Sequence, residues 1–220
     1  MEPSIVVVTP TYNERDTLQK LIELIFGLNI SNLRLVVVDD NSSDGTGKIA
    51  DGLAKRYPIK VIHRGSKMGL GTAYAEAFQF ILAATKADYI FEIDADLSHD
   101  PRDIPRFLEQ IENNDLVLGS RYISGGKIEN WSKTREWISR LGNIYARIVL
   151  TLPYRDITGG FKCYRRRVLD AINLDSLSSV GYNFQIETTY RAHRKRFRIR
   201  EIPITFTERK SGSSKFRAGI

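Results

Sequence analysis

The 220-residue sequence predicts an α/β fold, a doubly wound and mostly parallel sheet with helices on both faces. Short, almost continuously apolar runs alternate with longer stretches in which apolar residues recur at helical spacing, a pattern typical of parallel strands buried on both faces. Neither an internal repeat nor a linker rich in Pro, Gly or Ser divides the chain. Ligands of such sheets bind beyond the carboxyl ends of the strands, so we expect the site there.

The first 120 residues supply most of the predicted sheet. The predicted strands span residues 4–9, 33–38, 59–63, 89–93 and 115–118. The predicted helices between them span residues 16–28, 45–57, 71–84 and 101–112. In the first helix, Leu18, Leu21, Ile22 and Ile25 recur at the spacing of one helical face, which predicts that this face packs on the sheet.

The last 100 residues are less regular. Their pattern predicts a long amphipathic helix over 133–152, a second helix over 182–194, and an edge or closing strand over 199–207. Two interpretations of 133–152 stay open, a helix that faces the core and an interfacial helix that touches a membrane. Residues 211–220 have little to bury, which predicts a mobile tail.

The composition is that of an ordinary globular protein, with 42% hydrophobic and 27% charged residues. It excludes disorder and low complexity, and the single cysteine, Cys163, excludes a disulfide framework and an all-cysteine metal site. No apolar run approaches the ~18 residues that a bilayer span requires. The chain opens directly into a strand pattern without a signal peptide, which predicts a cytosolic protein.

Charge is distributed unevenly along the chain. Residues 1–120 carry 12 Lys and Arg against 18 Asp and Glu, whereas residues 121–220 carry 21 against 8. The resulting net charges of −6 and +13 give the +7 of the whole chain. Three interpretations remain open: a site where a cation and basic side chains handle an anionic ligand, a merely solvated basic surface, and a nucleic-acid-binding module.

Polar clusters follow three of the predicted strands. They are Pro-Thr-Tyr-Asn-Glu at 10–14, an Asp- and Ser-rich segment at 39–45, and Asp-Ala-Asp-Leu-Ser-His at 94–99. For Asn13 and Asp44, helix capping is the alternative interpretation. Asp94 and Asp96 point the same way on an extended chain and can share a hard divalent cation. The three histidines show no metal-ligand spacing, and none of them is assigned a role.

Four motifs occur in order along the chain: PTYNE at 10–14, VVVDDNS at 36–42, DADLSH at 94–99 and GSRY at 119–122. Together they resemble the family 2 glycosyltransferases of the GT-A fold. Further segments at 159–163, 181–187 and 201–215 resemble dolichyl- or polyprenyl-phosphate mannose synthases. The resemblance extends over essentially the whole chain.

The resemblance implies roles for particular residues. The nucleotide base and ribose pocket is lined by Pro10, Tyr12 and Glu14, with Val38 and Asp40 on its other wall. The donor diphosphate is held through Mg²⁺ or Mn²⁺ by Asp94, Ala95 and Asp96, and Ser98 is a metal ligand either directly or through water. Arg121 lies between the donor and acceptor phosphates, so the implied catalytic residues are Asp96 and Arg121. Arg209 and Lys215 also belong to the donor site, where they close over the diphosphate.

The implied reaction transfers mannose from GDP-mannose to a polyprenyl or dolichyl phosphate, with inversion. A lipid phosphate is already anionic, so no general base has to remove a proton. A UDP-glucose-dependent glucosyltransferase with the same acceptor is the near alternative. Transfer to a polysaccharide or protein requires a base that we cannot place, and a nucleic-acid-binding module requires salt-sensitive binding that does not depend on Asp96.

The resemblance also predicts the organisation and partners of the chain. We expect one domain over 1–220, with a nucleotide- and metal-binding half at 1–120, an acceptor half at 121–210 and the tail at 211–220. The expected location is cytoplasmic, peripheral to the cytoplasmic face of a membrane, without nucleic acid as a partner. The alternative to direct membrane contact is a membrane-embedded subunit or a membrane domain beyond Ile220. A Gly-rich segment at 64–71 is predicted to form a tight loop beside the donor site, or an ordinary strand-to-helix turn.

Overall fold

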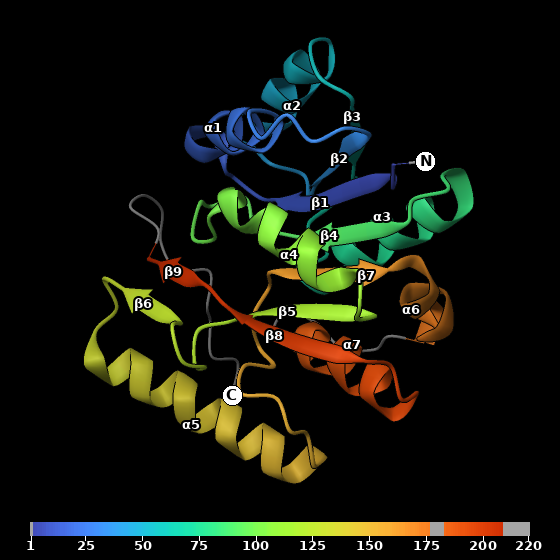
Figure 1. Cartoon of the computed structure of the whole chain (residues 1–220). Coiled ribbons are helices and arrows are strands. Elements are labelled where there is room, and N and C mark those ends of the chain that lie inside the picture. Colours follow the sequence, from blue (N-terminus) through green and yellow to red (C-terminus); the bar gives the residue numbers. More distant parts are fainter. Residues whose placement is uncertain (1, 177–182, 209–220) are drawn as a thin grey trace.

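The computed structural model describes residues 2–176 and 183–208 (Figure 1). Its main sheet has seven strands in the order β3-β2-β1-β4-β7-β5-β8, and a second sheet pairs β6 with β9. The main strands are β1 (Ile5–Thr11), β2 (Leu33–Asp39), β3 (Ile59–His63), β4 (Tyr89–Glu92), β5 (Leu116–Ser120), β7 (Lys162–Arg165) and β8 (Ile199–Pro203). The small sheet consists of β6 (Lys127–Glu129) and β9 (Thr205–Thr207). All neighbours in the main sheet are parallel except β7, which is antiparallel to both β4 and β5.

Helices cover both faces of the main sheet, which confirms the predicted doubly wound α/β fold. They are α1 (Arg15–Phe26), α2 (Thr46–Ala54), α3 (Leu70–Ala84), α4 (Ile104–Ile111), α5 (Lys133–Leu150), α6 (Arg166–Ala171) and α7 (Asn183–Arg194). Side chains alternate along a strand, so Ile5 and Val7 of β1 join the core under α1, α2 and α4. Val6 and Val8 join the opposite core, under α3, α6 and α7. Both cores are almost wholly apolar, and their burial is the main stabilising contribution to the fold.

Two features of the sheet differ from the sequence prediction. Strand β7 was not expected, because its four residues include a lysine and are too short to show alternation. The segment 199–207 was expected to be one strand, but it forms β8 in the main sheet and β9 in the small sheet, with Ile204 between them. Pro203 ends β8, which lies at the edge of the sheet where a residue without an N–H group is tolerated.

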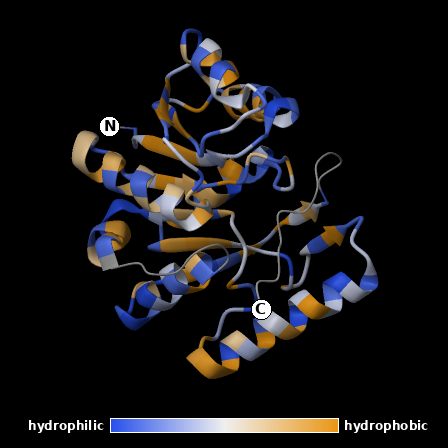
Figure 2. Cartoon of the chain, turned by 180° about the vertical axis from the view of Figure 1, so that it is seen from behind, coloured by the Kyte–Doolittle hydropathy of each residue, from blue (hydrophilic) through white to orange (hydrophobic). Residues whose placement is uncertain are grey.

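Helix α5 contradicts the interpretation that this helix faces the core. Seven large apolar side chains lie on its surface with 46–73% of their area exposed: Trp137, Ile138, Leu141, Ile144, Tyr145, Ile148 and Val149. Asn143 is the one buried residue of the helix, and it is held by polar contacts to Ile157 N and Thr158 Oγ1. Figure 2 shows apolar and polar turns alternating along this helix at the margin of the molecule. Helical spacing shows that a helix has an apolar stripe but not what the stripe faces.

Candidate active site

The loops that follow β1, β2 and β4 lie side by side, because these three strands are neighbours in the sheet. Asn13 accepts a hydrogen bond from Ser43 N at 3.0 Å, and Asn13 N donates to Ser42 Oγ at 2.9 Å, so the first two loops are tied together. Asp44 accepts from Arg15 N and Thr46 N, the first residues of α1 and α2. Asp44 thus binds N–H groups at the starts of both helices, although the N-cap residues are Glu14 and Gly45, neither of which makes a side-chain cap hydrogen bond. The structure brings the predicted clusters to one edge of the sheet.

The residues expected to line the nucleotide pocket are arranged along β1 and β2. Pro10 and Val38 are register partners and both are buried. Tyr12 is half-buried, and the ammonium group of Lys67 lies 3.8 Å from the centre of its ring. Glu14 N donates to Thr46 Oγ1 at 3.0 Å. At this edge of the sheet, Pro10 packs beside Val38, and the Tyr12 ring lies under the ammonium group of Lys67. That these residues bind a nucleotide stays a prediction.

Asp40 holds the Gly-rich loop 64–71 in place. Its Oδ1 accepts hydrogen bonds from Arg64 Nη1 and Met68 N, both at 2.9 Å, and its Oδ2 accepts from Gly69 N at 2.8 Å. Both side chains of the Asp40–Arg64 ion pair are almost fully buried. The loop turns at Gly69, whose φ of +96° favours glycine. Because this loop carries Lys67 to Tyr12, Asp40 helps to fix the position of the lysine over that ring.

The Asp-Ala-Asp segment forms a tight turn after β4. Asp96 Oδ1 accepts a hydrogen bond from Ser98 N at 3.0 Å, and Leu97 has a φ of +60°. Ala95 and Asp96 are buried, whereas the Asp94 side chain is 30% exposed. Gly160 passes so close that a Cβ on it would lie 3.2 Å from Asp94 Oδ2. The backbone of Gly159–Gly160 thus closes one side of Asp94, and a side chain at position 160 would be in tight contact with that carboxylate.

The donor chemistry of this turn suits a hard divalent cation. Carboxylate oxygens are the ligands that Mg²⁺ and Mn²⁺ prefer, and Asp94 and Asp96 supply them on one short turn. The Ser98 hydroxyl beside them is buried and makes no hydrogen bond to any residue that the structure describes. Over residues 2–176 and 183–208, no group of three or more His, Cys, Asp or Glu side chains forms a complete metal-binding cluster. A cation held by Asp94 and Asp96 would need further ligands from outside these side chains.

Arg121 is held in a fixed orientation by Asp156. Its Nε donates to Asp156 Oδ2 at 2.7 Å and its Nη2 to Oδ1 at 2.8 Å, while Nη2 also lies 2.8 Å from Thr158 Oγ1. Burial by itself raises the pKa of Asp156, but the charge and hydrogen bonds of Arg121 outweigh it and hold that pKa below its usual value. The carboxylate is therefore ionised at neutral pH and fixes the plane of the guanidinium group.

Aromatic rings and a second arginine surround Arg121, and none of them was predicted to belong to the site. The guanidinium carbon lies 5.8 Å from the Trp131 ring centre and 5.4 Å from that of Phe206. Arg135 stacks over Trp131 at 4.2 Å and pairs with Glu208. Asp156 was not predicted either, although an acid in the basic half, shortly before Gly159 and Gly160, was a usable signal. These residues join the end of β5, the start of α5 and β9 into one ring-lined region, in which each arginine is paired with a carboxylate.

A buried polar network lies beneath the aspartates. Glu92 and Lys162 are register partners on β4 and β7 and are both fully buried. Lys162 Nζ donates to Gln185 O at 2.7 Å and to the hydroxyls of Thr188 and Thr189 at 3.1 Å, so it anchors α7 to the sheet. Burial lowers the pKa of Lys162 to about 8, although the negative charge of Glu92 opposes the shift. This network fixes the strand end from which Asp94 projects.

Two predicted donor-site residues, Arg209 and Lys215, lie outside the described residues, as does the predicted tail 211–220. The described residues place two features at the carboxyl ends of the parallel strands, where ligands of such sheets bind. They are the turn with Asp94 and Asp96, which suits a cation, and Arg121, which Asp156 orients. These features suit an anionic ligand such as a phosphate.

Comparison with known proteins identifies the family. Residues 6–172 match the model of glycosyl transferase family 2, and the chain belongs to this family. The chain is 44% identical over 224 residues to the undecaprenyl-phosphate mannosyltransferase of Micrococcus luteus, covering 98% of this chain and 88% of the relative. It is 43% identical over 212 residues to the polyprenol monophosphomannose synthase of Mycolicibacterium smegmatis, covering 95% and 79%. The predicted family resemblance is confirmed.

Solved structures share the fold. Glucosyl-3-phosphoglycerate synthase from Mycobacterium tuberculosis, in complex with Mn²⁺, UDP and phosphoglyceric acid, matches with a TM-score of 0.71 and 20% identity. The match covers 96% of this chain and 72% of that one. The same enzyme was also solved with Mg²⁺ and UDP, at the same TM-score and identity. These matches confirm the GT-A architecture predicted for the sheet.

Proposed function

We propose that this glycosyltransferase transfers mannose from GDP-mannose to a polyprenyl phosphate such as dolichyl phosphate, with inversion, giving polyprenyl-phosphate β-mannose. The observation that carries the proposal is the 43–44% identity, over nearly the whole chain, to two relatives named for a polyprenol or undecaprenyl phosphate and mannose. The acidic turn and the oriented arginine provide the two kinds of group that this reaction needs.

In this proposal Asp94 and Asp96 hold Mg²⁺ or Mn²⁺ against the donor diphosphate. The cation stabilises the negative charge that develops on the nucleoside diphosphate as it leaves the sugar. The partly exposed carboxylate of Asp94 and the Asp96 turn support this assignment. Ser98 adds a hydroxyl at the same turn.

Arg121 reduces the repulsion between the donor diphosphate and the acceptor phosphate. Its orientation is fixed in advance by Asp156 and Thr158, so its charge is positioned without loss of side-chain freedom during the reaction. The acceptor oxygen is already anionic and attacks the anomeric carbon directly, in a single displacement. A general base is not required, because the attacking oxygen carries no proton that has to be removed.

Calorimetric titration with GDP-mannose and with UDP-glucose tests the donor, each in Mn²⁺ and in EDTA. We expect binding of GDP-mannose in Mn²⁺ and loss of that binding in EDTA, because the cation joins the carboxylates to the diphosphate. A preference for UDP-glucose would instead assign the chain to glucosyl transfer. Binding that EDTA does not change would contradict the metal-dependent site.

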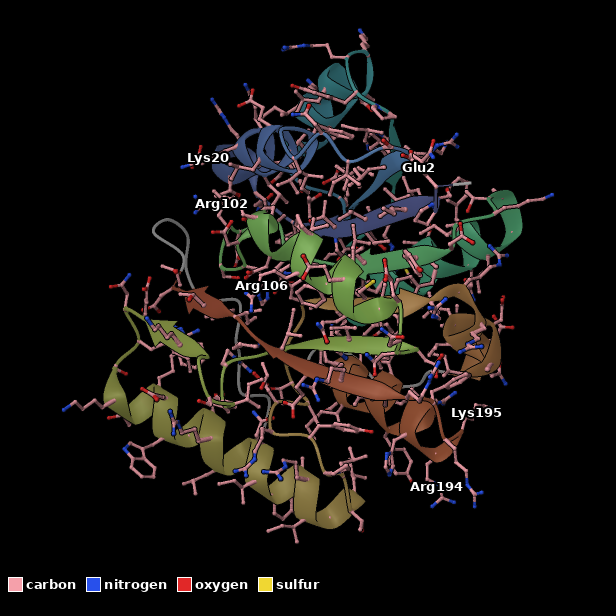
Figure 3. The ribbon with its side chains drawn as sticks, viewed as in Figure 1. Glu2, Lys20, Arg102, Arg106, Arg194 and Lys195 are labelled. Atoms are coloured by element: carbon pink, nitrogen blue, oxygen red, sulfur yellow. The ribbon has the colours of Figure 1, made fainter. Side chains whose placement is uncertain are left out.

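We further propose that α5 lies on the membrane that carries the acceptor. No helix in the described part of the chain is long and apolar enough to cross a bilayer. The exposed stripe of α5 offers large apolar and aromatic side chains to an interface instead. Arg194 and Lys195 point outward at the same lower end of the molecule as α5, where they can attract anionic lipids (Figure 3).

Replacing Tyr145 and Ile148 together by glutamate tests this surface, because both side chains are more than 70% exposed and their loss leaves the core intact. We expect co-sedimentation with anionic vesicles at low salt to fall at least about 10-fold, since each buried apolar side chain contributes about 1.5 kcal/mol or more. The control is Lys20→Gln with Lys55→Gln, which makes the same change in net charge on α1 and after α2, far from α5 (Figure 1). Equal vesicle binding by both double variants would contradict the role of α5.

A further inference from the structure

Two buried side chains from different elements face the carboxylate of Asp94 from inside the protein. The Tyr74 hydroxyl, on α3, lies 3.5 Å from Oδ1 of Asp94. Nε2 of His99, in the loop after β4, lies 3.6 Å from Oδ2. Tyr74 and His99 are buried, whereas Asp94 is partly exposed. Each oxygen of Asp94 therefore faces one buried polar group while the rest of the carboxylate stays open to solvent.

The polar ring of His99 is buried between two phenylalanine rings. Its ring centre lies 5.4 Å from that of Phe161 and 5.1 Å from that of Phe206. Neither ring nitrogen has a hydrogen-bond partner among the described residues. Burying such nitrogens costs free energy that a phenylalanine in the same place would not. The group that Nε2 faces is Asp94, and a short move of either side chain brings the two into hydrogen-bond distance.

Tyr74 approaches the other oxygen from a rigid position. Its ring stacks on Phe184 of α7, with the centres 5.8 Å apart and the planes 10° apart, and packs against Phe78 at 6.0 Å. The hydroxyl lies 3.5 Å from Asp94 Oδ1, where it can donate a hydrogen bond to the carboxylate.

We propose that Tyr74 and His99 are positioning residues that hold Asp94 in the orientation in which it meets the divalent cation. The inference rests on the metal site of the proposed function and adds to it the residues that set its geometry. Partners that orient a metal-binding carboxylate typically change metal affinity about 10–100-fold when they are removed. Removing either partner is therefore expected to lower the affinity for the cation more than it lowers the stability of the fold.

The test uses Tyr74→Phe and His99→Phe, which remove the polar atoms and keep an aromatic ring in each place. Mn²⁺ binding is measured by electron paramagnetic resonance in the presence of GDP and without acceptor, so the readout does not depend on turnover. We expect the half-saturating Mn²⁺ concentration to rise about 10-fold in each variant. In assays of mannosyl transfer, saturating Mn²⁺ is expected to restore most of kcat. His99→Gln, which keeps an N–H donor, is expected to recover part of the lost affinity.

The matched control is Tyr154→Phe, which removes a tyrosine hydroxyl bonded to His193 Nδ1 at 3.1 Å, a contact that does not involve Asp94. Wild-type Mn²⁺ affinity in Tyr74→Phe and His99→Phe would overturn the inference and leave the proposed function standing. An equal loss of affinity in Tyr154→Phe, together with equally lowered melting temperatures, would assign the effect to packing and also overturn it. Failure of the wild type to take up Mn²⁺ with either GDP or UDP would overturn the metal-dependent function itself, and the inference with it.

Discussion

Replacing Asp96 with alanine is expected to abolish metal-dependent donor binding and to lower turnover by at least about 100-fold. Asp96 lies at the centre of the acidic turn, where its Oδ1 also accepts the hydrogen bond from Ser98 N. The alanine variant loses both the charge and this bond. Asp96→Asn loses the charge but keeps an oxygen that can accept the hydrogen bond from Ser98 N. It therefore distinguishes an effect on cation binding from an effect on the conformation of the turn. We expect Asp96→Asn to fold as the wild type and to be equally inactive.

The control for Asp96 is Asp100→Asn, four residues further along. Asp100 caps the 3₁₀ turn at Pro101–Asp103 by accepting from Arg102 N, and asparagine can keep that bond. Calorimetry with GDP-mannose and Mn²⁺ should therefore find near-normal binding in this variant. If Asp96→Asn bound donor and Mn²⁺ as tightly as Asp100→Asn, the turn would not hold the cation.

Arg121→Lys is expected to lower kcat about 100-fold while the KM for donor stays close to that of the wild type. Lysine keeps one positive charge but cannot make the bidentate hydrogen bonds to Asp156. Its charge is therefore not held in the orientation that the proposal assigns to Arg121, between the two phosphates. Steady-state kinetics with donor and acceptor varied separately checks this split. An unchanged kcat would refute the role of Arg121.

Arg121→Ala is expected to destabilise the fold as well. It leaves the carboxylate of Asp156 buried without its cation, which typically costs about 3–5 kcal/mol of unfolding free energy. Chemical denaturation measures this loss. The control is Arg106→Lys and Arg106→Ala, on an outward-pointing side chain of α4 paired with Asp103, where little change in stability or kcat is expected (Figure 3).

Much of the fold and the acidic turn could be predicted because the signals are local. The apolar runs of β1 and β2 and the helical spacing in α1 depend on residues two to four positions apart. Asp94 and Asp96 are near neighbours in the chain, so a shared turn follows from their spacing. The same locality explains the errors, because strand β7 is too short to show a period and the stripe of α5 does not reveal its surroundings.

The sequence by itself determined the α/β class, the edge of the sheet where the polar loops meet, and membership of glycosyl transferase family 2. Only the tertiary structure decided that Asp156 orients Arg121 across 35 positions, that Tyr74 and His99 face the two oxygens of Asp94, and that the apolar stripe of α5 is exposed. The physical reason is the range of the interactions. Secondary structure and short motifs follow from chain geometry over a few residues, whereas the partner of a buried charge depends on how distant elements pack.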